Sequence, residues 1–365
     1  MAVKRKKLFE NTSGRRHFPS GRLRRLFVFL AVFSFGTGSA FVFPRQTQEA
    51  ETVGNDSGLK FLGNEIVRLS KLADGVVGVG IIHLETGREL YVNGDVLFPM
   101  ASTYKVPIAV QILSLVEEGK MSLDKMIPVT AEDCRGMGGT ISEWLRPPGV
   151  SISVKNLLSL MLMISDNSAT DINIGLAGGA EAVTERMRKI GIQNITVSRP
   201  TWTLIVDWLG LEVDPNKVYS HEELNAVYAA LTAERREKSN EAFNKDPQDT
   251  ATPQAMTDLL KRIWKGEILT KKHTELLLDI MKRCDTGKGR IRGILPPGTV
   301  VHDKTGTIGQ TLNDVGYIVL PDNAGTVVIS VYIKESNKDE SVREKTIAQI
   351  SRAAYDYFLF NPGAH

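Results

Sequence analysis

The chain of 365 residues has little cysteine, and Cys134 and Cys284 are its only two thiols. This number excludes the disulfide framework of small secreted domains and the repeated cysteine spacing of zinc sites. A single bridge between the two cysteines stays open at this point. Because no cysteine lies near the N-terminus, we do not expect an anchor through a lipid-modified cysteine.

A net positive charge is also missing from most of the chain. Residues 1–25 contain nine Lys and Arg against one Glu, a net charge of +8, whereas the whole chain has a formal charge of +3. Residues 26–365 therefore carry −5, and a body with this charge is not expected to bind nucleic acid. The composition, 42% hydrophobic and 24% charged, excludes a mainly disordered, collagen-like or polytopic membrane protein.

A long apolar run follows the basic segment directly. Residues 26–43 contain no charged side chain, and small residues gather at Gly38-Ser39-Ala40. A basic segment, an apolar run and a small-x-small end are typical of a secretory signal, and 18 residues can also span a membrane as an uncleaved anchor. We therefore expect residues 1–43 to be a signal peptide or membrane anchor and residues 44–58 to be a polar tether. The rest is then exported, to the periplasm or the cell exterior.

The periodicity of apolar residues changes twice along the exported part. It predicts strands over 75–83, 89–92, 299–302, 314–320 and 326–333, and helices over 59–73, 102–119, 153–163, 181–190, 253–264 and 342–358. The strands lie near both ends, and most helices lie between them. This order predicts an α+β fold for residues 59–365. An antiparallel sheet built from both termini is flanked by helices, and an all-helical subdomain of residues 102–290 is inserted into it.

A serine and a lysine stand one helical turn apart in Ser102-Thr103-Tyr104-Lys105, at the start of a mostly apolar predicted helix. A serine hydroxyl becomes a nucleophile when a nearby base takes its proton, and a lysine of lowered pKa can be that base. The same spacing in Ser122-Leu123-Asp124-Lys125 is followed by Ile127-Pro128, where a helix cannot continue. We therefore assign the nucleophile to Ser102.

Two further motifs follow in order, Ser165-Asp166-Asn167 after an apolar helix and Lys304-Thr305-Gly306-Thr307 on a predicted strand. Taken alone, the Ser-Asp-Asn motif could equally be an ordinary helix cap. The Lys-Thr-Gly motif alone could equally be the exposed edge of a strand where a turn begins. Together with Ser-x-x-Lys they form the set found in class A β-lactamases and penicillin-binding proteins.

The chain resembles the class A β-lactamase family in these motifs and in their surroundings. Phe98-Pro99-Met100 precedes the serine, Asp249-Thr250-Ala251-Thr252-Pro253 resembles the family's Asp-Thr-x-Thr-Pro segment, and Asn313-Asp314 follows the Lys-Thr-Gly motif. The resemblance covers about residues 59–360. It implies the β-lactamase/transpeptidase-like fold and a serine hydrolase that forms a covalent acyl-enzyme.

The resemblance also implies a role for each motif residue. Ser102 would be the acylated nucleophile, Lys105 its proton partner and Ser165 the proton relay to the leaving nitrogen. The backbone N–H groups of Ser102 and Thr307 would form the oxyanion hole, and Asp166 would fix the turn. The implied substrate-binding residues are Asn167, Lys304, Thr305 and Gly306. The substrate would be a β-lactam or a cell-wall peptide, and we expect a monomer without cofactor or metal ion.

One residue of the family pattern is missing. The family has a loop glutamate, in a Glu-x-x-Leu-Asn run, that activates the water which releases the acyl group. The matching position here is Thr201, two residues after Arg199, and threonine is not a base at neutral pH. Glu222 or Glu223, in an insert of about residues 206–248, could replace the glutamate. Arg199 is expected to brace the loop, and the charged stretch 233–245 to be a solvated helix.

Three hypotheses remain open. The first is a β-lactam hydrolase that uses another base or releases its product slowly, and the Asp-Thr-x-Thr-Pro segment favours it. The second is a penicillin-binding, D,D-peptidase-like serine hydrolase of the cell envelope, which explains the missing glutamate better. The third is a non-catalytic binder of wall peptides, against which the intact serine, lysine and hydroxyl set argues.

Overall fold

The computed structural model describes residues 50–52, 56–135, 138–147, 149–214 and 217–361. The predicted signal peptide or anchor lies outside these residues, as does most of the predicted tether. In the described residues, no helix is both long enough and apolar enough to cross a membrane. Cys134 and Cys284 are both buried and free, so the bridge that the sequence left open is not formed.

An antiparallel sheet joins the two ends of the described chain. Its strand order is β1-β3-β2-β10-β9-β8. The N-terminal half supplies three strands and the C-terminal half the other three: β1 (Ala50–Thr52), β2 (Val76–His83), β3 (Glu89–Val92), β8 (Val300–Ile308), β9 (Thr311–Val319) and β10 (Thr326–Lys334). The halves meet where β2 pairs with β10, with Val79 opposite Val331. The predicted sheet built from both termini is confirmed.

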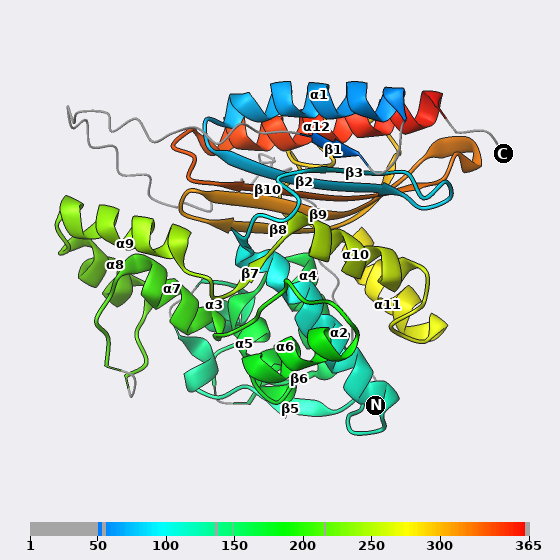
Figure 1. The fold of residues 1–365 in the computed structure, drawn as a ribbon. Helices are drawn as coiled ribbons and strands as arrows, with labels where there is room; N and C mark the ends of the chain where they lie inside the picture. The colour runs from blue at the N-terminus through cyan, green and yellow to red at the C-terminus, as the bar shows by residue number, and fades with distance from the viewer. Residues whose placement is uncertain (1–49, 53–55, 136–137, 148, 215–216, 362–365) are drawn as a thin grey trace, which may run out of the picture. The chain divides into compact units, whose positions relative to one another are not determined.

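Helices cover both faces of this sheet, which is why its central strands are buried along almost their whole length. α1 (Ser57–Ser70) and α12 (Glu340–Phe360) lie together over one face (Figure 1). Alternate residues of β10, such as Ile329 and Val331, pack in the core under them. The residues between, such as Val328 and Tyr332, belong to the core on the opposite face.

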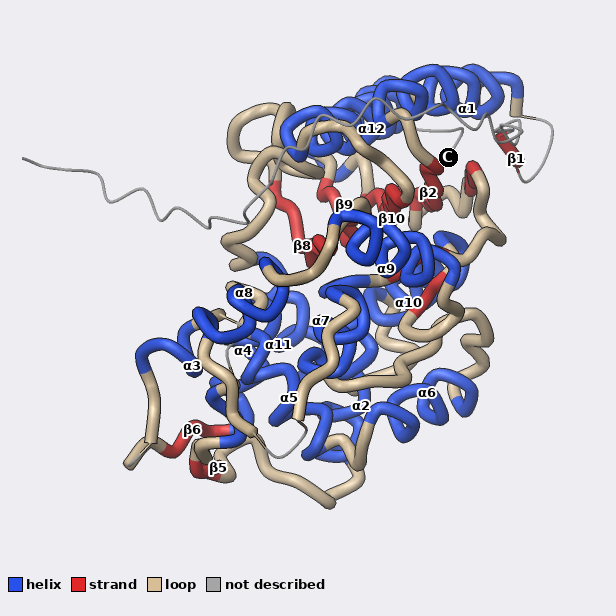
Figure 2. The backbone as a smooth tube through the Cα atoms, turned by 90° about the vertical axis from the view of Figure 1, so that its left-hand side faces the viewer, coloured by secondary structure: helices blue, strands red, loops and turns tan. Residues whose placement is uncertain are grey.

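The remaining helices lie on that opposite face, and the view along the sheet separates the two layers (Figure 2). α10 (Pro253–Trp264) packs on β2 and β10, and α11 (Lys271–Lys282) packs on β8. The inserted helices are α2 (Lys105–Glu117), α3 (Thr140–Trp144), α4 (Val154–Met163), α5 (Asn167–Leu176), α6 (Ala180–Lys189), α7 (Thr201–Leu209), α8 (His221–Ala229) and α9 (Ala233–Lys245). Most of the apolar helix α2 is buried, and it contacts α4, α5 and α6.

The structure differs from the expectations in several places, and α3, α5, α7, α8 and α11 are helices that the sequence pattern did not predict. Ala50–Thr52, inside the predicted tether, pair with β3 as an edge strand. The subdomain expected to be all-helical also contains a short antiparallel pair, β5 (Met126–Pro128) with β6 (Ser151–Ser153). It contains β7 (Thr250–Ala251) as well, which pairs with β4 (Phe98–Pro99) just before the subdomain. The helix expected from residue 102 begins with a 3-10 turn before α2. The solvated helix expected over 233–245 is α9, in which Phe243 is buried.

Candidate active site

The segment that carries Ser102 is fixed on both sides. Ser102 lies in the 3-10 turn η2 (Ala101–Tyr104), which runs directly into α2. Ala101 has a φ of 45°, a left-handed conformation that is strained for a residue with a side chain. Asn313 on β9 donates from Nδ2 to the carbonyl oxygens of Pro99 (2.9 Å) and Met100 (3.0 Å). These contacts hold the backbone just before Ser102, whose own side chain is partly exposed.

Lys105 is fully buried in the first turn of α2. Its Nζ donates to the backbone oxygen of Ser165 (2.8 Å), to Ser165 Oγ (3.0 Å) and to Asn167 Oδ1 (3.0 Å). Lys304 Nζ donates to the same Ser165 Oγ at 3.1 Å. The structure thus brings residues of all three motifs together, with the Ser165 hydroxyl bridging two lysines.

Burial and mutual repulsion act on these lysines. Burial lowers the pKa of Lys105 well below its usual range, and the positive charge of Lys304 lowers it further, against the attraction of Asp166 and Asp171. Burial also lowers the pKa of Lys304. An amine with a depressed pKa is neutral more often near pH 7, and a neutral Lys105 can accept a proton from Ser102.

Ser165-Asp166-Asn167 forms the junction between α4 and α5. Ser165 has a φ of 59°, which turns the chain sharply between the two helices. Asp166 caps α5 by accepting the backbone N–H of Ala169 at 2.8 Å, and its other oxygen accepts the backbone N–H of Ile141 at 3.1 Å. The structural role expected for Asp166 is confirmed, because both contacts hold backbone.

The Lys-Thr-Gly strand β8 has partners that the sequence analysis missed. Thr305 Oγ1 is hydrogen-bonded to Thr286 Oγ1 at 2.6 Å. Arg290, which is 3% exposed, donates to Thr307 Oγ1 at 2.7 Å and to the backbone oxygen of Gly306 at 3.2 Å. The guanidinium also pairs with Glu344 at 3.1 Å and Glu340 at 3.2 Å, so it ties this strand to α12. Thr286 and Arg290 precede β8 in a stretch without periodic pattern, so only the folded chain reveals them.

Gly306 lets β8 approach the nucleophile closely. A Cβ at this position would lie 2.6 Å from the carbonyl oxygen of Met100 and 3.1 Å from the backbone nitrogen of Ser102. A side chain would therefore push the strand away from Ser102. The approach puts the backbone of Ser102 beside the strand that carries Thr307, as an oxyanion hole made from their N–H groups requires.

Comparisons with known proteins agree with this geometry. The model of the β-lactamase enzyme family matches residues 62–358. The chain belongs to the β-lactamase enzyme family. It is similar to β-lactamase VEB-1 of Pseudomonas aeruginosa, with 28% identity over 81% of this chain and 89% of that protein. It is also similar to β-lactamase SME-1 of Serratia marcescens, with 28% identity over 80% and 86% of the two chains.

Solved structures confirm the β-lactamase fold. A β-lactamase from Chitinophaga pinensis superposes with a TM-score of 0.67 and 28% identity, over 81% of this chain and 98% of that one. TLA-1 extended-spectrum β-lactamase superposes with a TM-score of 0.68 and 28% identity, over 83% of this chain and all of that one. The mixed architecture predicted from the sequence is that of this family.

A buried hydroxyl lies at the position that the sequence analysis matched to the β-lactamase loop glutamate. Thr201 begins α7, is 5% exposed, and its Oγ1 is hydrogen-bonded to the hydroxyl of Tyr104 at 2.5 Å. The loop around it is attached to α5, because Asp171 accepts the backbone N–H groups of Thr201 (2.5 Å) and Trp202 (3.0 Å). Asp171 belongs to none of the three motifs, although its spacing of four from Asn167 places both on one face of a helix.

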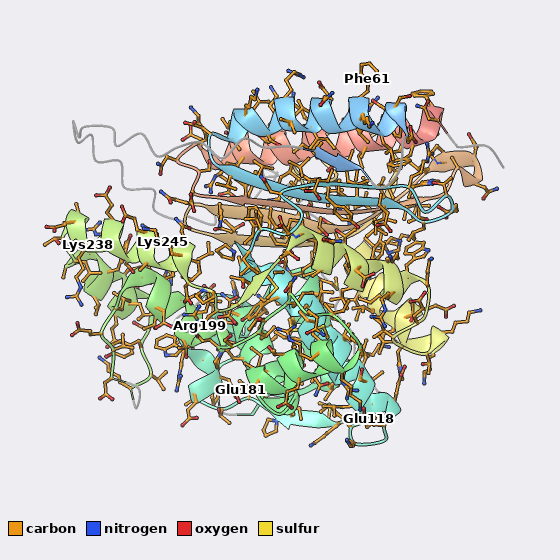
Figure 3. All side chains as sticks on the ribbon, in the orientation of Figure 1. Phe61, Glu118, Glu181, Arg199, Lys238 and Lys245 are labelled. Carbon is orange, nitrogen blue, oxygen red and sulfur yellow. The ribbon has the colours of Figure 1, made fainter. Side chains whose placement is uncertain are left out.

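Arg199 braces this loop, as expected. Its side chain lies in the helical part of the protein (Figure 3). Its Nε donates to Asp249 Oδ2 at 2.7 Å, and its other nitrogens lie 2.8 Å from Asp207 and 2.9 Å from Asp246. Asp249 also accepts the backbone N–H of Ser198 at 2.7 Å. The guanidinium thus connects the loop to the end of α7, to the end of α9 and to the Asp-Thr-x-Thr-Pro segment.

The two insert glutamates lie at the exposed start of α8. Glu223 accepts the backbone N–H of Ser220 at 2.8 Å in a capping box and pairs with Lys217 at 2.8 Å. Glu222 is exposed beside it in the same first turn. These placements argue against either side chain as the replacement for the loop glutamate.

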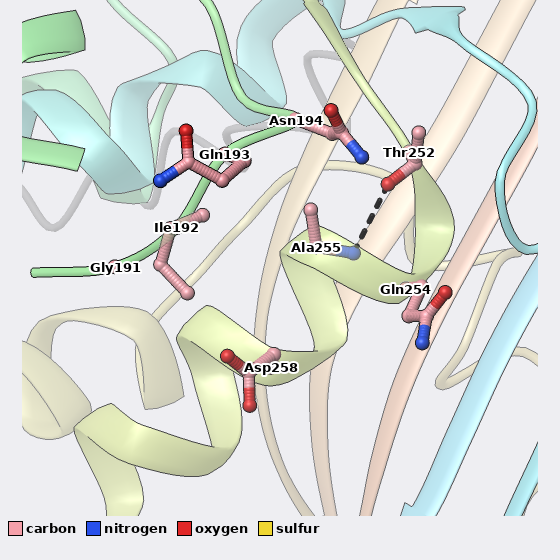
Figure 4. A pocket seen from close by; sticks show the side chains of 8 residues that line it. All are labelled: Gly191, Ile192, Gln193, Asn194, Thr252, Gln254, Ala255 and Asp258. Atoms are coloured by element: carbon pink, nitrogen blue, oxygen red, sulfur yellow. Dashed lines mark hydrogen bonds between the residues drawn. The ribbon is translucent and has the colours of Figure 1, made fainter. Parts of the chain in front are cut away.

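Two cavities lie near the helical part. One, of about 210 Å³, lies between residues 191–194 and the start of α10, and shares no residue with the three motifs (Figure 4). The other, of about 340 Å³, is lined by residues that include Asp133, Arg135, Asp171, Pro200 and Trp202. The second cavity therefore reaches the loop that carries Thr201 and the carboxylate that holds it.

Proposed function

We propose that the protein is a serine β-lactam hydrolase that works through an acyl-enzyme on Ser102. The observation that carries this proposal is the buried contact set in which Lys105, Ser165 and Lys304 meet around one hydroxyl. A β-lactam carries a carboxylate, for which Lys304 and the Thr305 hydroxyl are matched donors. Asn167 is the residue that would bind the amide of the substrate side chain.

Acylation follows from the charges of this set. Neutral Lys105 takes the proton of Ser102 as the Ser102 oxygen attacks the β-lactam carbonyl carbon. The developing oxyanion is held by the backbone N–H groups of Ser102 and Thr307. The β-lactam nitrogen then receives a proton from the Ser165 hydroxyl, which regains one from Lys105. The transfer between Lys105 and Ser165 uses a contact of 3.0 Å that already exists in the structure.

Release of the acyl group should be the slow step. Loss of a positioned general base costs about 10²–10⁴ in rate, or about 3–5 kcal/mol on the deacylation barrier. Thr201 cannot replace that base, because its hydroxyl is buried and bonded to Tyr104. We therefore expect a burst of acylation followed by slow turnover, with the acyl-enzyme accumulating.

A second function is favoured by the absence of a glutamate at position 201, where the chain has Thr201. Penicillin-binding D,D-peptidase-like hydrolases of the cell envelope also form an acyl-enzyme through Ser-x-x-Lys, Ser-Asp-Asn and Lys-Thr-Gly sets. A peptide that ends in D-Ala-D-Ala presents a carboxylate to the same Lys304. Release of D-alanine from such a peptide faster than opening of any β-lactam would favour this alternative.

We further propose that the protein acts outside the cytoplasm, delivered or anchored by the apolar run at 26–43. The basic residues before this run orient it so that the following domain is exported. Fractionation of the native cell should find the protein in the periplasm, the medium or the membrane. Recovery of the native protein from the cytoplasm would contradict this proposal.

The hydrolase proposal is tested by pre-steady-state hydrolysis of a chromogenic cephalosporin. Wild type should open about one equivalent in a fast phase and continue slowly, and Ser102→Ala should show neither phase. Ser122→Ala, which changes the other Ser-x-x-Lys serine, is the matched control and should behave like wild type. Equal hydrolysis by Ser102→Ala and wild type would refute the proposal.

A further inference from the structure

Helix α9 of the insert is polar and solvated along most of its length. Among its residues, all of which the structure describes, only Phe243 is buried. This side chain belongs to a small apolar cluster whose other buried members are Ala101, Leu204 and Ile308. The one apolar anchor of a charged helix therefore lies in a cluster that includes residues on both sides of the reaction centre.

Two members of this cluster adjoin the residues of the expected oxyanion hole. Ala101 directly precedes Ser102, and Ile308 directly follows Thr307 on β8. Ala101 also has the strained φ of 45°, and such a conformation persists only where the surrounding packing holds it. Packing that keeps Ala101 and Ile308 in one cluster therefore also sets where the N–H groups of Ser102 and Thr307 lie.

The same face of α9 contacts the turn between β8 and β9. Asn244 Nδ2 donates to Gln310 Oε1 at 2.8 Å. Gly309 has a φ of 51°, and a Cβ at this position would lie only 3.2 Å from Asn240 Oδ1. Positions 240, 243 and 244 share one face of a helix. Two polar side chains and one apolar side chain of α9 therefore meet the end of the Lys-Thr-Gly strand.

Helix α9 is itself attached to α7. Trp208 Nε1 donates to Asn240 Oδ1 at 2.8 Å, and Ser239 Oγ donates to the backbone oxygen of Trp208 at 2.8 Å. Leu204 of α7 belongs to the same apolar cluster as Phe243. These contacts fix the helix that carries Phe243, so that the aromatic side chain packs from a rigid support.

We propose that Phe243 is a positioning residue for the oxyanion hole. It touches neither the substrate nor the reacting atoms, and it acts through Ala101 and Ile308. Removal of the ring leaves a cavity in this cluster, and partial collapse into that cavity displaces the N–H donors from the developing oxyanion. This inference rests on the proposed acyl-enzyme. It supplies no base for the deacylating water, so slow release is still expected.

The test is the infrared band of the acyl carbonyl, in an acyl-enzyme formed from a penicillin with an isotope label at the β-lactam carbonyl carbon. Hydrogen bonds from the oxyanion hole weaken this C=O bond and lower its frequency. Phe243→Ala should therefore move the band to higher frequency and lower the acylation rate constant by about 10- to 100-fold. The dissociation constant of the non-covalent complex should stay within about threefold of wild type, because the interaction that is lost acts in the transition state.

A graded series and a matched control separate positioning from general stability. Phe243→Leu keeps most of the apolar volume and should acylate within about threefold of wild type, with Phe243→Val between the leucine and alanine variants. Leu224, which is 4% exposed, lies on α8 in a separate apolar cluster of the insert that includes Tyr219. Leu224→Ala also leaves a cavity and should lower Tm, but it should keep the wild-type band and acylation rate.

The outcomes separate the failures. If wild type forms no acyl-enzyme with any β-lactam, the proposed function itself fails. If wild type acylates and Phe243→Ala shows the same band and the same acylation rate, only the positioning role is overturned. An equal band shift in Leu224→Ala would overturn it as well, since loss of stability would then be the cause. If Phe243→Ala does not fold, an unchanged band in Phe243→Val would have the same consequence.

Discussion

Arg199→Ala should destabilise the protein more than the removal of any exposed charge. The Arg199 side chain is 9% exposed and faces Asp249, which is 2% exposed, at 2.7 Å. Burial already raises the pKa of Asp249 in spite of this contact, so its charge depends on the remaining partners. After the substitution, those partners are the backbone N–H groups of Ser198 and residue 199.

The magnitude follows from the burial of the pair. Removing one partner of a buried ion pair costs about 3–5 kcal/mol, because the other charge is left without compensation. Unfolding entropy is about 2.1 cal/mol/K per residue, so roughly 300 folded residues give about 0.6 kcal/mol/K. Arg199→Ala should therefore lower Tm by about 5–8 °C. Exposed Asp207 adds little to this value, since its side chain is 45% exposed.

The assay is thermal unfolding followed by circular dichroism, with Lys238→Ala as the matched control. Lys238 pairs with Glu234 at 2.8 Å on α9, but both side chains are about three-quarters exposed. The control should therefore change Tm by less than about 1 °C. Asp249→Ala, and the double variant with Arg199→Ala, complete a cycle that measures the coupling between the two side chains.

A Tm of Arg199→Ala within about 1 °C of wild type would refute this reasoning. It would mean that Asp249 is satisfied without the guanidinium, or that the loop unfolds locally in the native protein. Single variants that add without coupling in the double variant would lead to the same conclusion.

The remaining predictions concern the reaction. Lys304→Ala should raise the pKa of Lys105, because a positive neighbour is lost. Acylation needs neutral Lys105, so the acid limb of the pH profile of the acylation rate should move to higher pH. An acid limb that does not move would contradict the electrostatic effect of Lys304 on Lys105. Thr201→Glu should speed release of the acyl group by at least about tenfold, whereas Thr201→Gln should not, as stopped-flow hydrolysis can show. Thr286→Val removes the hydroxyl bonded to Thr305 and should raise KM for substrates that carry the carboxylate, with little change for analogues that lack it.

The sheet could be predicted from the sequence because its signal is local. β2, β9 and β10 are rich in Val and Ile, and β-branched residues favour buried strands. β1 gave no such signal, since three residues, two of them polar, form it only by pairing at the edge of β3. Helix α5 was not predicted, because its first residue belongs to the Ser-Asp-Asn motif and its following residues have weak apolar periodicity.

Some residues of the candidate site could likewise be predicted from local sequence, and others could not. Ser102, Lys105, Ser165 and Lys304 belong to short motifs whose spacing along the chain carries the information. Arg290 contacts Thr307, and Thr286 contacts Thr305, only once β8 is in place in the sheet. No local sequence pattern therefore predicts these two residues. Asp171 is intermediate between these cases. Its spacing from Asn167 was visible, but its contacts to Thr201 and Trp202 depend on how the loop folds back on α5.

The identity of the acylated residue tests the account most directly. Wild-type protein incubated with a penicillin should gain the mass of one intact penicillin, and peptide mapping should place the adduct on Ser102. Ser102→Ala should gain no mass under the same conditions, and Ser122→Ala should gain the same mass as wild type. An adduct that maps to Ser122, or a wild-type protein that gains no mass from any β-lactam, would contradict the central claim.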